Sequence, residues 1–286
     1  MLHAQGPVLT EPDDRPTCLV VGSPIAHSLS PVLHRAAYAE LGLDWRYEAV
    51  ELVEDQLADY LDGHPVRGVS VTMPLKQVAL ALAAGADPVA VTVGAANTLT
   101  PVERGWRADN TDVPGAVSAL ARHGVTDLTG ASVVLVGAGG TARGMLAALG
   151  RLGVDRLRVL ARRPDTAVTA LTPVADALGI RLTVEPLTAG AFGRPDLLVA
   201  TTPAGALDAF ADAAARAATV FEVLYDPWPT PLVAAAWRSG ARVVGGLDLL
   251  VGQAGRQVEL MTGCAAAPVE AMRAAGVAAL AERHSA

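Results

Sequence analysis

A glycine-rich segment that follows a short apolar run is the feature of this sequence that most constrains the fold. Residues 132–136 are one serine and four apolar residues, and an amphipathic stretch follows over residues 141–152. A GxGxxA pattern between a strand and a helix is typical of dinucleotide sites, because its glycines allow a tight turn and a close approach of the pyrophosphate to the backbone. We therefore predict a dinucleotide site, rather than a purely structural turn, at Gly137, Ala138, Gly139, Gly140, Thr141 and Ala142.

The strand after this turn indicates which dinucleotide binds. It ends in Arg162 and Arg163, and no carboxylate stands where NAD sites place an acid against the ribose hydroxyls. Two guanidinium groups suit the additional phosphate of NADP, because each presents a fixed fork of N–H donors. We predict NADP(H) as the cofactor. A solvated basic loop is the alternative, and Asp165 close by slightly favours it.

Short apolar segments alternate with amphipathic ones along the whole chain. A predicted helix at residues 113–122 separates two such series, the second of which starts near residue 131. This alternation predicts an α/β fold with parallel strands covered on both faces by helices. The length of 286 residues and the hydrophobic content of 51% fit two domains, which we divide near Asp112. Ser30 and Pro31 are predicted as the cap and the first residue of a helix.

Charge and cysteine content argue against several functional classes. The net charge is −7, from 22 basic and 29 acidic residues, so neither nucleic acid nor an anionic membrane is expected as a partner. No stretch reaches the roughly 18 to 20 apolar residues of a spanning helix. The two cysteines form no metal or disulfide pattern, and the six histidines are scattered, so we expect no metal and a reducing cytoplasm. Residues 1–16 are predicted to be a loose leader.

Four segments rich in small polar residues stand where loops are expected to leave the strands, at residues 22–31, 70–76, 95–99 and 108–112. In open α/β sheets, ligands bind at the carboxyl ends of strands. Hydroxyls, an amide, a lysine and an aspartate gathered there suit a hydroxylated anion. Each residue alone has a simpler interpretation: Ser30 and Asp112 as helix caps, Asn97 as a turn former and Lys76 as a solvated residue.

Taken in order, these motifs resemble those of the shikimate dehydrogenases. The resemblance runs from about residue 19 to the C-terminal helices. It rests on Ser28-Leu-Ser30-Pro31, Val71 to Lys76, Asn97-Thr98-Leu99, Asp109 to Asp112, the turn at Gly137, Tyr225 with Pro227 and Thr230-Pro231-Leu232, and the segment from Gly246 to Gln253.

This resemblance implies a two-domain α/β fold, in which an open, mainly parallel substrate-binding sheet is joined to a Rossmann-like NADP-binding domain. The substrate domain would hold residues 17–112 and 246–286, and the cofactor domain residues 113–245. The implied activity is the reversible, NADPH-dependent reduction of 3-dehydroshikimate to shikimate, in the pathway to aromatic amino acids. The implied partner is this small molecule alone, bound by a monomer or homodimer.

The resemblance also implies roles for individual residues. Lys76 would act as general acid/base with Asp112 as its partner, since an ammonium can stabilise the developing oxyanion and donate a proton. Ser28 and Ser30, with Tyr225, would hold the substrate carboxylate, and Thr72, Asn97 and Gln253 the ring hydroxyls. Val223 and Gly246 would lie at the nicotinamide, with Ala161 and Thr201 also near the cofactor.

Departures from the family pattern leave related functions open. Val113 and Asp248 replace smaller or neutral residues, and we expect them to alter the cleft wall and so the substrate range. Quinate or an amino analogue of shikimate is the nearest alternative substrate. A non-catalytic sensor of NADP and shikimate is a more distant alternative, and a folate-type NADP dehydrogenase is disfavoured by the Ser28 and Tyr225 motifs.

Overall fold

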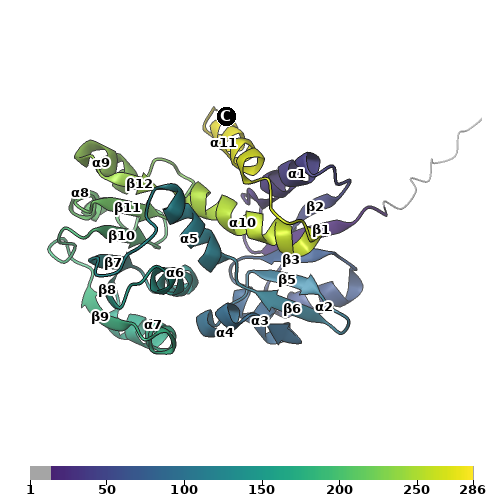
Figure 1. The fold of residues 1–286 in the computed structure, drawn as a ribbon, viewed down its shortest axis with the longest axis horizontal. Helices are drawn as coiled ribbons and strands as arrows, with labels where there is room; N and C mark the ends of the chain where they lie inside the picture. Colours follow the sequence, from purple (N-terminus) through teal and green to yellow (C-terminus); the bar gives the residue numbers. More distant parts are fainter. Residues whose placement is uncertain (1–13, 286) are drawn as a thin grey trace, which may run out of the picture.

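The computed structural model describes residues 14–285, and side chains as far as residue 283, as two lobes that each contain a six-stranded sheet (Figure 1). The first sheet consists of β1 (Thr17–Gly22), β2 (Arg46–Glu51), β3 (Gly68–Val71), β4 (Gly85–Ala86), β5 (Thr98–Pro101) and β6 (Trp106–Asp109). Its strand order is β2-β1-β3-β5-β6-β4, and only β5 runs antiparallel to its neighbours. The carboxyl ends of β1, β3 and β6 therefore meet at one edge.

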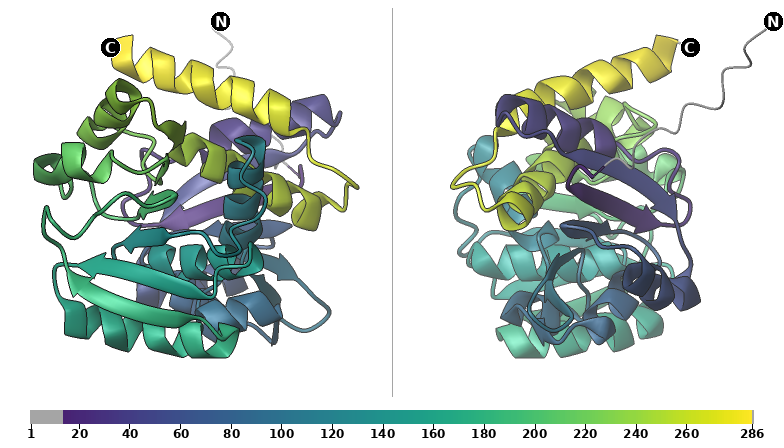
Figure 2. Two further views of the ribbon diagram at one scale, coloured as in Figure 1. Left: turned by 60° about the vertical axis from the view of Figure 1, so that its left-hand side comes forward. Right: turned by 90° about the vertical axis from the view of Figure 1, so that its right-hand side faces the viewer.

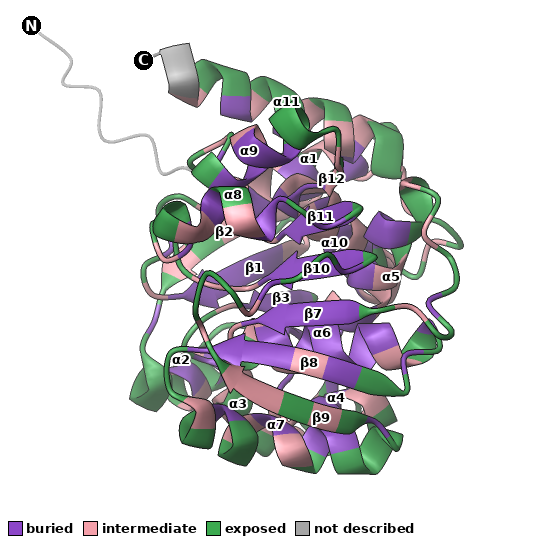
Figure 3. Ribbon diagram, turned by 90° about the vertical axis from the view of Figure 1, so that its left-hand side faces the viewer, coloured by how far each residue is buried: buried purple, intermediate pink, exposed green. Residues whose placement is uncertain are grey.

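The second sheet is parallel throughout. It consists of β7 (Val133–Val136), β8 (Arg156–Ala161), β9 (Arg181–Pro186), β10 (Leu197–Ala200), β11 (Thr219–Glu222) and β12 (Arg242–Val244). The order β12-β11-β10-β7-β8-β9 is that of a Rossmann fold, in which successive strands are added on one side of β7 and then, from β10 onward, on its other side. Figure 3 shows the central strands buried and the edge strand β9 partly exposed.

Helices cover both faces of each sheet, as their apolar faces require. They are α1 (Ser30–Glu40), α2 (Leu57–Gly63), α3 (Lys76–Leu82), α4 (Pro88–Val93), α5 (Asp112–Arg122), α6 (Gly140–Arg151), α7 (Pro164–Leu178), α8 (Ala211–Ala214), α9 (Pro231–Ser239), α10 (Gly246–Thr262) and α11 (Val269–Ser285), with 3₁₀ turns η1 (Glu54–Gln56) and η2 (Asp208–Phe210). No helix within residues 14–285 has the length and hydropathy needed to cross a membrane.

Helices α5 and α10 connect the lobes and cross each other closely between them (Figure 1). The crossing requires glycine on both helices. A Cβ on Gly115 would lie 2.6 Å from the backbone nitrogen of Gln253, and a Cβ on Gly252 would lie 2.7 Å from the carbonyl oxygen of Gly115. This contact brings the first turn of α5 next to the middle of α10, which is where the site lies.

The predicted α/β fold class is confirmed, and the apolar run at residues 132–136 and the helical segments at 113–122 and 141–152 form β7, α5 and α6 within one residue of their expected bounds. The prediction of Ser30 as a helix cap is wrong. The backbone of Leu29 is already helical, with φ −85° and ψ −6°, so Leu29 takes the cap position and Ser30 begins α1. The oxygen Oγ of Ser28 accepts the backbone N–H of Ser30 at 3.3 Å. Residues 1–13 of the predicted leader lie outside the described residues.

Candidate active site

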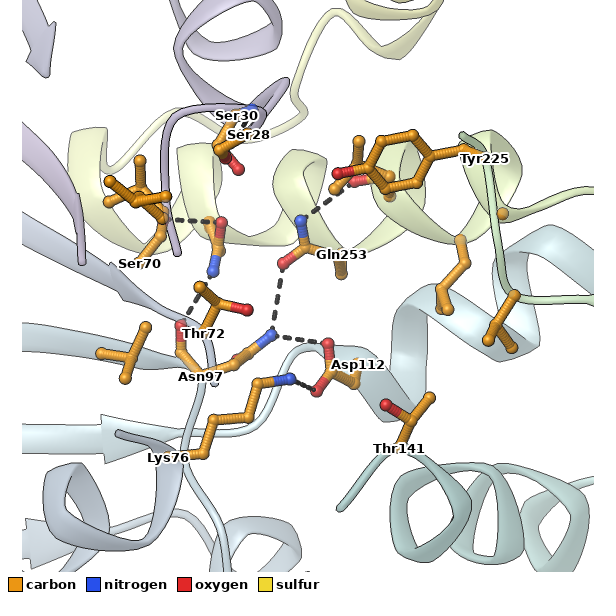
Figure 4. A pocket seen from close by; sticks show the side chains of 18 of the residues that line it. Ser28, Ser30, Ser70, Thr72, Lys76, Asn97, Asp112, Thr141, Tyr225 and Gln253 are labelled. Carbon is orange, nitrogen blue, oxygen red and sulfur yellow. Dashed lines mark hydrogen bonds and ion pairs between the residues drawn. The ribbon is translucent and has the colours of Figure 1, made fainter. Parts of the chain in front are cut away.

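A cleft of about 380 Å³ lies between the lobes and is lined by residues of β1 and β3, of the loop after β11, and of α10. It collects most of the residues predicted to bind the substrate or to act on it. The predicted residues that line it are Ser28, Ser30, Thr72, Lys76, Asn97, Asp112, Thr141, Val223, Tyr225, Gly246 and Gln253. Their side chains come from segments far apart in the chain (Figure 4).

Lys76 and Asp112 form an ion pair at the floor of the cleft. Each is the first residue of its helix, α3 or α5, and the Nζ and Oδ2 atoms are 2.6 Å apart. Their side chains are only 24% and 18% exposed, so the pair lies largely out of water yet opens to the cleft. The second carboxylate oxygen, Oδ1, accepts a hydrogen bond from Nδ2 of Asn97 at 3.0 Å. Both carboxylate oxygens are thus oriented, and the ammonium faces the cavity.

Asn97 is the centre of a hydrogen-bond network that joins the two lobes' connecting helices. Its Oδ1 accepts the backbone N–H of Thr111 at 2.8 Å, and its Nδ2 donates to Oε1 of Gln253 at 3.2 Å. Asn110 fixes the same turn, since its Oδ1 accepts the backbone N–H of Asp112 at 3.1 Å. Asn110 therefore does the capping that was considered for Asp112. The amide of Asn97 is only 2% exposed and is held in one orientation by these partners.

Sequence reasoning missed a set of buried polar side chains in which Ser70 and Gln257 line the cleft and Tyr47 and His34 contact them. Gln257 accepts the hydroxyl of Ser70 at 2.7 Å through Oε1 and donates through Nε2 to the carbonyl of Asn97 at 2.9 Å. Ser70 also accepts the hydroxyl of Tyr47 at 2.5 Å. His34 contacts Gln257 at 3.3 Å, and burial lowers the pKa of His34 to about 3, so its ring is neutral. The available signal was spacing, because Gln257 follows Gln253 by four residues and shares its helix face.

Ser28 and Ser30 lie at the opposite end of the cleft from the ion pair, and the ring of Tyr225 faces them across Gln253 (Figure 4). Burial raises the pKa of the Tyr225 hydroxyl, and the nearby charge of Arg283 partly offsets that effect. Three hydroxyls at one end of a cleft form a neutral donor set that suits an anion.

The loop that carries Tyr225 is held at both sides. The carboxylate of Glu222 accepts the backbone N–H of Leu224 at 3.3 Å and the hydroxyl of Thr230 at 3.4 Å. Burial raises the pKa of Glu222 to about 7. On the other side, Gly246 donates its N–H to the carbonyl of Leu224 at 3.2 Å, and a Cβ there would lie 2.2 Å from the carbonyl of Val223. Only glycine fits at this contact.

The predicted cofactor residues gather at the carboxyl edge of the second sheet. Gly137 has φ +106°, and a Cβ there would lie 2.6 Å from Oγ1 of Thr201. Helix α6 begins after Gly139 with no side-chain cap among the described residues, and added Cβ atoms at Gly139 and Gly140 would meet nothing within 4 Å. The free N–H groups and the open space above them form a cradle that suits a pyrophosphate.

Ala138, Ala142, Ala161, Arg162 and Arg163 also lie at this edge and do not line the 380 Å³ cleft. The two arginines directly follow β8 and are exposed, and neither pairs with another described residue. Their position beside the glycine turn fits a phosphate on the cofactor ribose. Within residues 14–285, no three His, Cys, Asp or Glu side chains gather to hold a metal ion.

The expectation that Val113 and Asp248 alter the cleft wall is wrong. Val113 is fully buried in the core that α5 shares with α6. Asp248 faces away from the cavity, where its Oδ2 lies 3.0 Å from Nε2 of His123 and its Oδ1 lies 2.5 Å from Arg273. Both residues stabilise helix contacts, since the helices turn these side chains away from the substrate region.

Comparison with known proteins agrees with this geometry. Family models match two segments, the shikimate dehydrogenase substrate binding domain at residues 20–99 and the shikimate 5'-dehydrogenase C-terminal domain at residues 246–275. The shikimate dehydrogenase (NADP(+)) of Caulobacter vibrioides is 36% identical over 269 residues, which cover 87% of this chain and 90% of that protein. The chain belongs to the shikimate dehydrogenase family.

Solved structures of shikimate dehydrogenases share the whole fold. The Mycobacterium tuberculosis enzyme superposes with a TM-score of 0.85 and 40% identity, covering 92% of this chain and 99% of its own. The Thermus thermophilus enzyme, solved in complex with NADP(H) and shikimate, has a TM-score of 0.81 and 31% identity, covering 93% and 100%. The resemblance inferred from the ordered motifs is therefore confirmed, as is the two-domain fold with a Rossmann-like domain.

Proposed function

We propose that this protein catalyses the reversible, NADP-dependent reduction of 3-dehydroshikimate to shikimate. The observation that carries the proposal is the ion pair of Lys76 and Asp112 at 2.6 Å, in a cleft that also holds Asn97, Gln253 and a hydroxyl-rich end. An acid/base group beside donors for several hydroxyls and one carboxylate matches this substrate. The names of the family members and the NADP(H) and shikimate complex of the Thermus thermophilus enzyme support the assignment.

Lys76 is the proposed general acid/base. During reduction, negative charge develops on the carbonyl oxygen of the substrate, and the ammonium of Lys76 stabilises it and donates the proton. In the reverse direction, the neutral amine accepts the hydroxyl proton. Asp112 favours the charged lysine by Coulomb attraction and holds it in position, and Asn97 fixes the carboxylate through Oδ1. Removal of Lys76 should therefore act on turnover more than on binding.

The remaining lining side chains are proposed to orient the ring. Ser28, Ser30 and Tyr225 hold the carboxylate at one end, while Thr72, Asn97 and Gln253 bind the hydroxyls near the ion pair. Since the two ends of the cleft differ in chemistry, the substrate has one productive direction. Ser70 and Gln257 line the same cleft, and their hydrogen bonds join this part of its wall to the Asn97 carbonyl.

NADP is the proposed cofactor, because the free N–H groups and the open space at the glycine turn suit its pyrophosphate. Gly137, Ala138, Gly139, Gly140, Thr141 and Ala142 would hold the pyrophosphate at the start of α6, with Arg162 and Arg163 on the 2'-phosphate and Ala161, Thr201, Val223 and Gly246 along the rest. When bound there, NADPH supplies the hydride that reduces the carbonyl carbon. The protein itself orients the substrate, stabilises the charge that develops on it and donates the proton.

We also propose the domain division that the motifs implied. Residues 17–112 and 246–286 form the substrate domain, and residues 113–245 form the cofactor domain, in agreement with the two sheets. The proposed partners are small molecules only, bound by a monomer or homodimer. The free cysteines, Cys18 and Cys264, are consistent with the proposed cytoplasmic location.

The test is a set of initial rates for the purified protein with shikimate or quinate, each with NADP⁺ or NAD⁺. Shikimate with NADP⁺ should give the highest kcat/KM by at least roughly tenfold, the scale of one well-placed charged contact. A dominant quinate rate would contradict the assigned substrate, and a dominant NAD⁺ rate would contradict the role of the arginines. No turnover in any combination, with shikimate still bound, would favour a sensor.

A further inference from the structure

The C-terminal helix α11 runs across the top of both lobes, from α1 of the first lobe toward α9 of the second (Figure 2). Near its end, Arg283 reaches two loops that belong to different lobes. Its NH1 donates to the carbonyl of His27 at 3.1 Å and lies 3.5 Å from Oδ2 of Asp226. The side chain is 29% exposed, so the contacts are partly shielded from water. Arg283 thus bridges the first lobe's 22–31 loop and the loop that follows β11.

Each residue that Arg283 contacts is the immediate chain neighbour of a residue proposed to bind the substrate carboxylate. His27 precedes Ser28, and Asp226 follows Tyr225. Because backbone neighbours move together, the distance between Ser28 and Tyr225 depends on the bridge. Glu222 and Gly246 also hold the Tyr225 loop, but the Arg283 guanidinium contacts both loops at once.

The bridge formed by Arg283 also affects the electrostatic potential of the cleft. Among the described residues that line the cavity, Lys76 is paired with Asp112, and the carboxylate end presents the neutral hydroxyls of Ser28, Ser30 and Tyr225. Lys76 is the one lysine or arginine among the described lining residues, and His27 also lines this end, so the substrate anion would meet no unpaired ammonium or guanidinium of the lining. The guanidinium of Arg283 lies just behind the carboxylate end of the cleft and supplies positive potential there. Because its position is partly desolvated, its charge interacts with an anion more strongly than it would in bulk water. Burial raises the pKa of the Tyr225 hydroxyl, and the charge of Arg283 offsets part of that effect.

We propose that Arg283 is a positioning residue for the anionic end of the substrate: it ties the loops of Ser28 and Tyr225 together across the lobes, and its charge favours a carboxylate between them. This inference rests on the proposed function and adds to it a residue outside the cleft lining. It predicts an effect on the affinity for the charged substrate and little effect on proton transfer, because Lys76 and Asp112 lie at the far end of the cleft.

The experiment compares steady-state kinetics of the full-length wild type with Arg283→Gln, Arg283→Lys and Glu270→Gln. Glu270 is the matched control, because it lies on the first turn of the same helix and pairs with Arg122 at 2.6 Å, away from the cleft. Shikimate and its uncharged methyl ester are the two substrates, with NADP⁺ as cofactor. Thermal melting of each variant verifies that it is folded.

Arg283→Gln should raise the KM for shikimate by roughly threefold to tenfold, the range for a partly screened charge, and change kcat and the KM for NADP⁺ by less than about twofold. Arg283→Lys should recover most of the affinity, since it keeps the charge. Glu270→Gln should match the wild type. For the methyl ester, the KM should rise by less than it does for shikimate, because an uncharged ligand loses only the effect of the loop contacts and not that of the charge.

Three outcomes would overturn the inference. The first is an unchanged KM for shikimate in folded Arg283→Gln. The second is an equal loss of affinity for the methyl ester, which would assign a structural role that is independent of charge. The third is the same loss in Glu270→Gln, which would place the effect in the docking of α11. A wild-type protein that neither binds nor oxidises shikimate would instead overturn the proposed function, and this inference with it.

Discussion

The substrate side and the cofactor side of the site use different chemical groups of the chain. On the substrate side, the functional groups are side chains, and those at the ion pair are held by a shared network: Asp112 by Lys76 and Asn97, and Asn97 by Gln253 and the Thr111 backbone. On the cofactor side, the working groups are backbone N–H groups at a glycine turn, and Arg162 and Arg163 project into solvent.

This difference determines which substitutions each side of the site tolerates. A network of buried hydrogen bonds loses several partners when one member is removed, so its effects are large and not additive. A pyrophosphate site made of backbone N–H groups depends on the backbone conformation and on open space above it. An added Cβ would therefore disrupt the site, whereas most substitutions of nearby side chains would not. The exposed arginines act nearly independently of the rest. Four sets of measurements test this contrast between the substrate side and the cofactor side.

The largest effect is expected on the substrate side. Lys76→Ala should lower kcat by about 10²- to 10⁴-fold, because it removes the proposed proton donor and leaves the Asp112 carboxylate without its partner. The affinity for NADPH, measured by fluorescence titration, should stay within about twofold of the wild type. Near-normal turnover in the variant would exclude Lys76 as the acid/base.

On the cofactor side, Gly137→Ala should destabilise the fold by about 3 kcal/mol, because it combines a strained positive φ with a clash against Thr201. Gly179→Ala is the control, since Gly179 also has positive φ (+68°) but an added Cβ there meets nothing within 4 Å. Urea denaturation measures both. Equal losses in the two variants would mean that the strained φ alone matters and that close packing at the turn does not.

The arginines should show a smaller and more selective effect. Arg162→Ala and Arg163→Ala should each raise the KM for NADP⁺ by roughly tenfold through loss of a charge-assisted contact to the 2'-phosphate. The KM for NAD⁺, which lacks that phosphate, should be unchanged. Melting temperatures should not move, because both side chains are exposed and unpaired with other described residues. A parallel rise for both cofactors would contradict phosphate recognition.

The smallest net effect in the wild type is the pH dependence of stability, because one buried group in each lobe contributes to it with opposite sign. His34 has a folded pKa of about 3 against an ordinary value of 6.5, so the unfolded state binds the extra proton and stability falls as the pH drops below 6.5. Glu222 has a folded pKa of about 7 against 4.5, so its contribution is full below pH 4.5 and is lost as the pH rises through 7.

Variants separate these two contributions. Glu222→Gln should make the free energy of unfolding fall more steeply from pH 6.5 to 4.5 than in the wild type, by at most about 1.4 kcal/mol per pH unit. His34→Asn should make the same slope shallower or reverse it. Urea denaturation across this range measures both slopes. Slopes that change in the same direction in both variants would contradict the assignment.

Local patterns sufficed for much of the fold and for the main site residues. The glycine turn, the strand before it and the helix after it lie within a residue or so of their predicted positions, because turn chemistry and periodicity act over a few neighbours. The short β4, α4 and β12 were not predicted, since segments of two to six residues carry too little periodicity. The cap at Ser30 was misplaced by one residue, because Leu29 was already helical.

The sequence by itself determined the order of the motifs, and with it the family, the two-sheet α/β fold and the residue types at the site. Only the tertiary structure decided which distant residues meet. Lys76 and Asp112 are 36 positions apart in the sequence, yet their side chains lie 2.6 Å apart because β3 and β6 end at one sheet edge. Gln257 joins Ser70 across 187 residues because α10 returns between the lobes, and Arg283 reaches His27 across 256. Such contacts depend on how whole elements pack, and no local pattern specifies them.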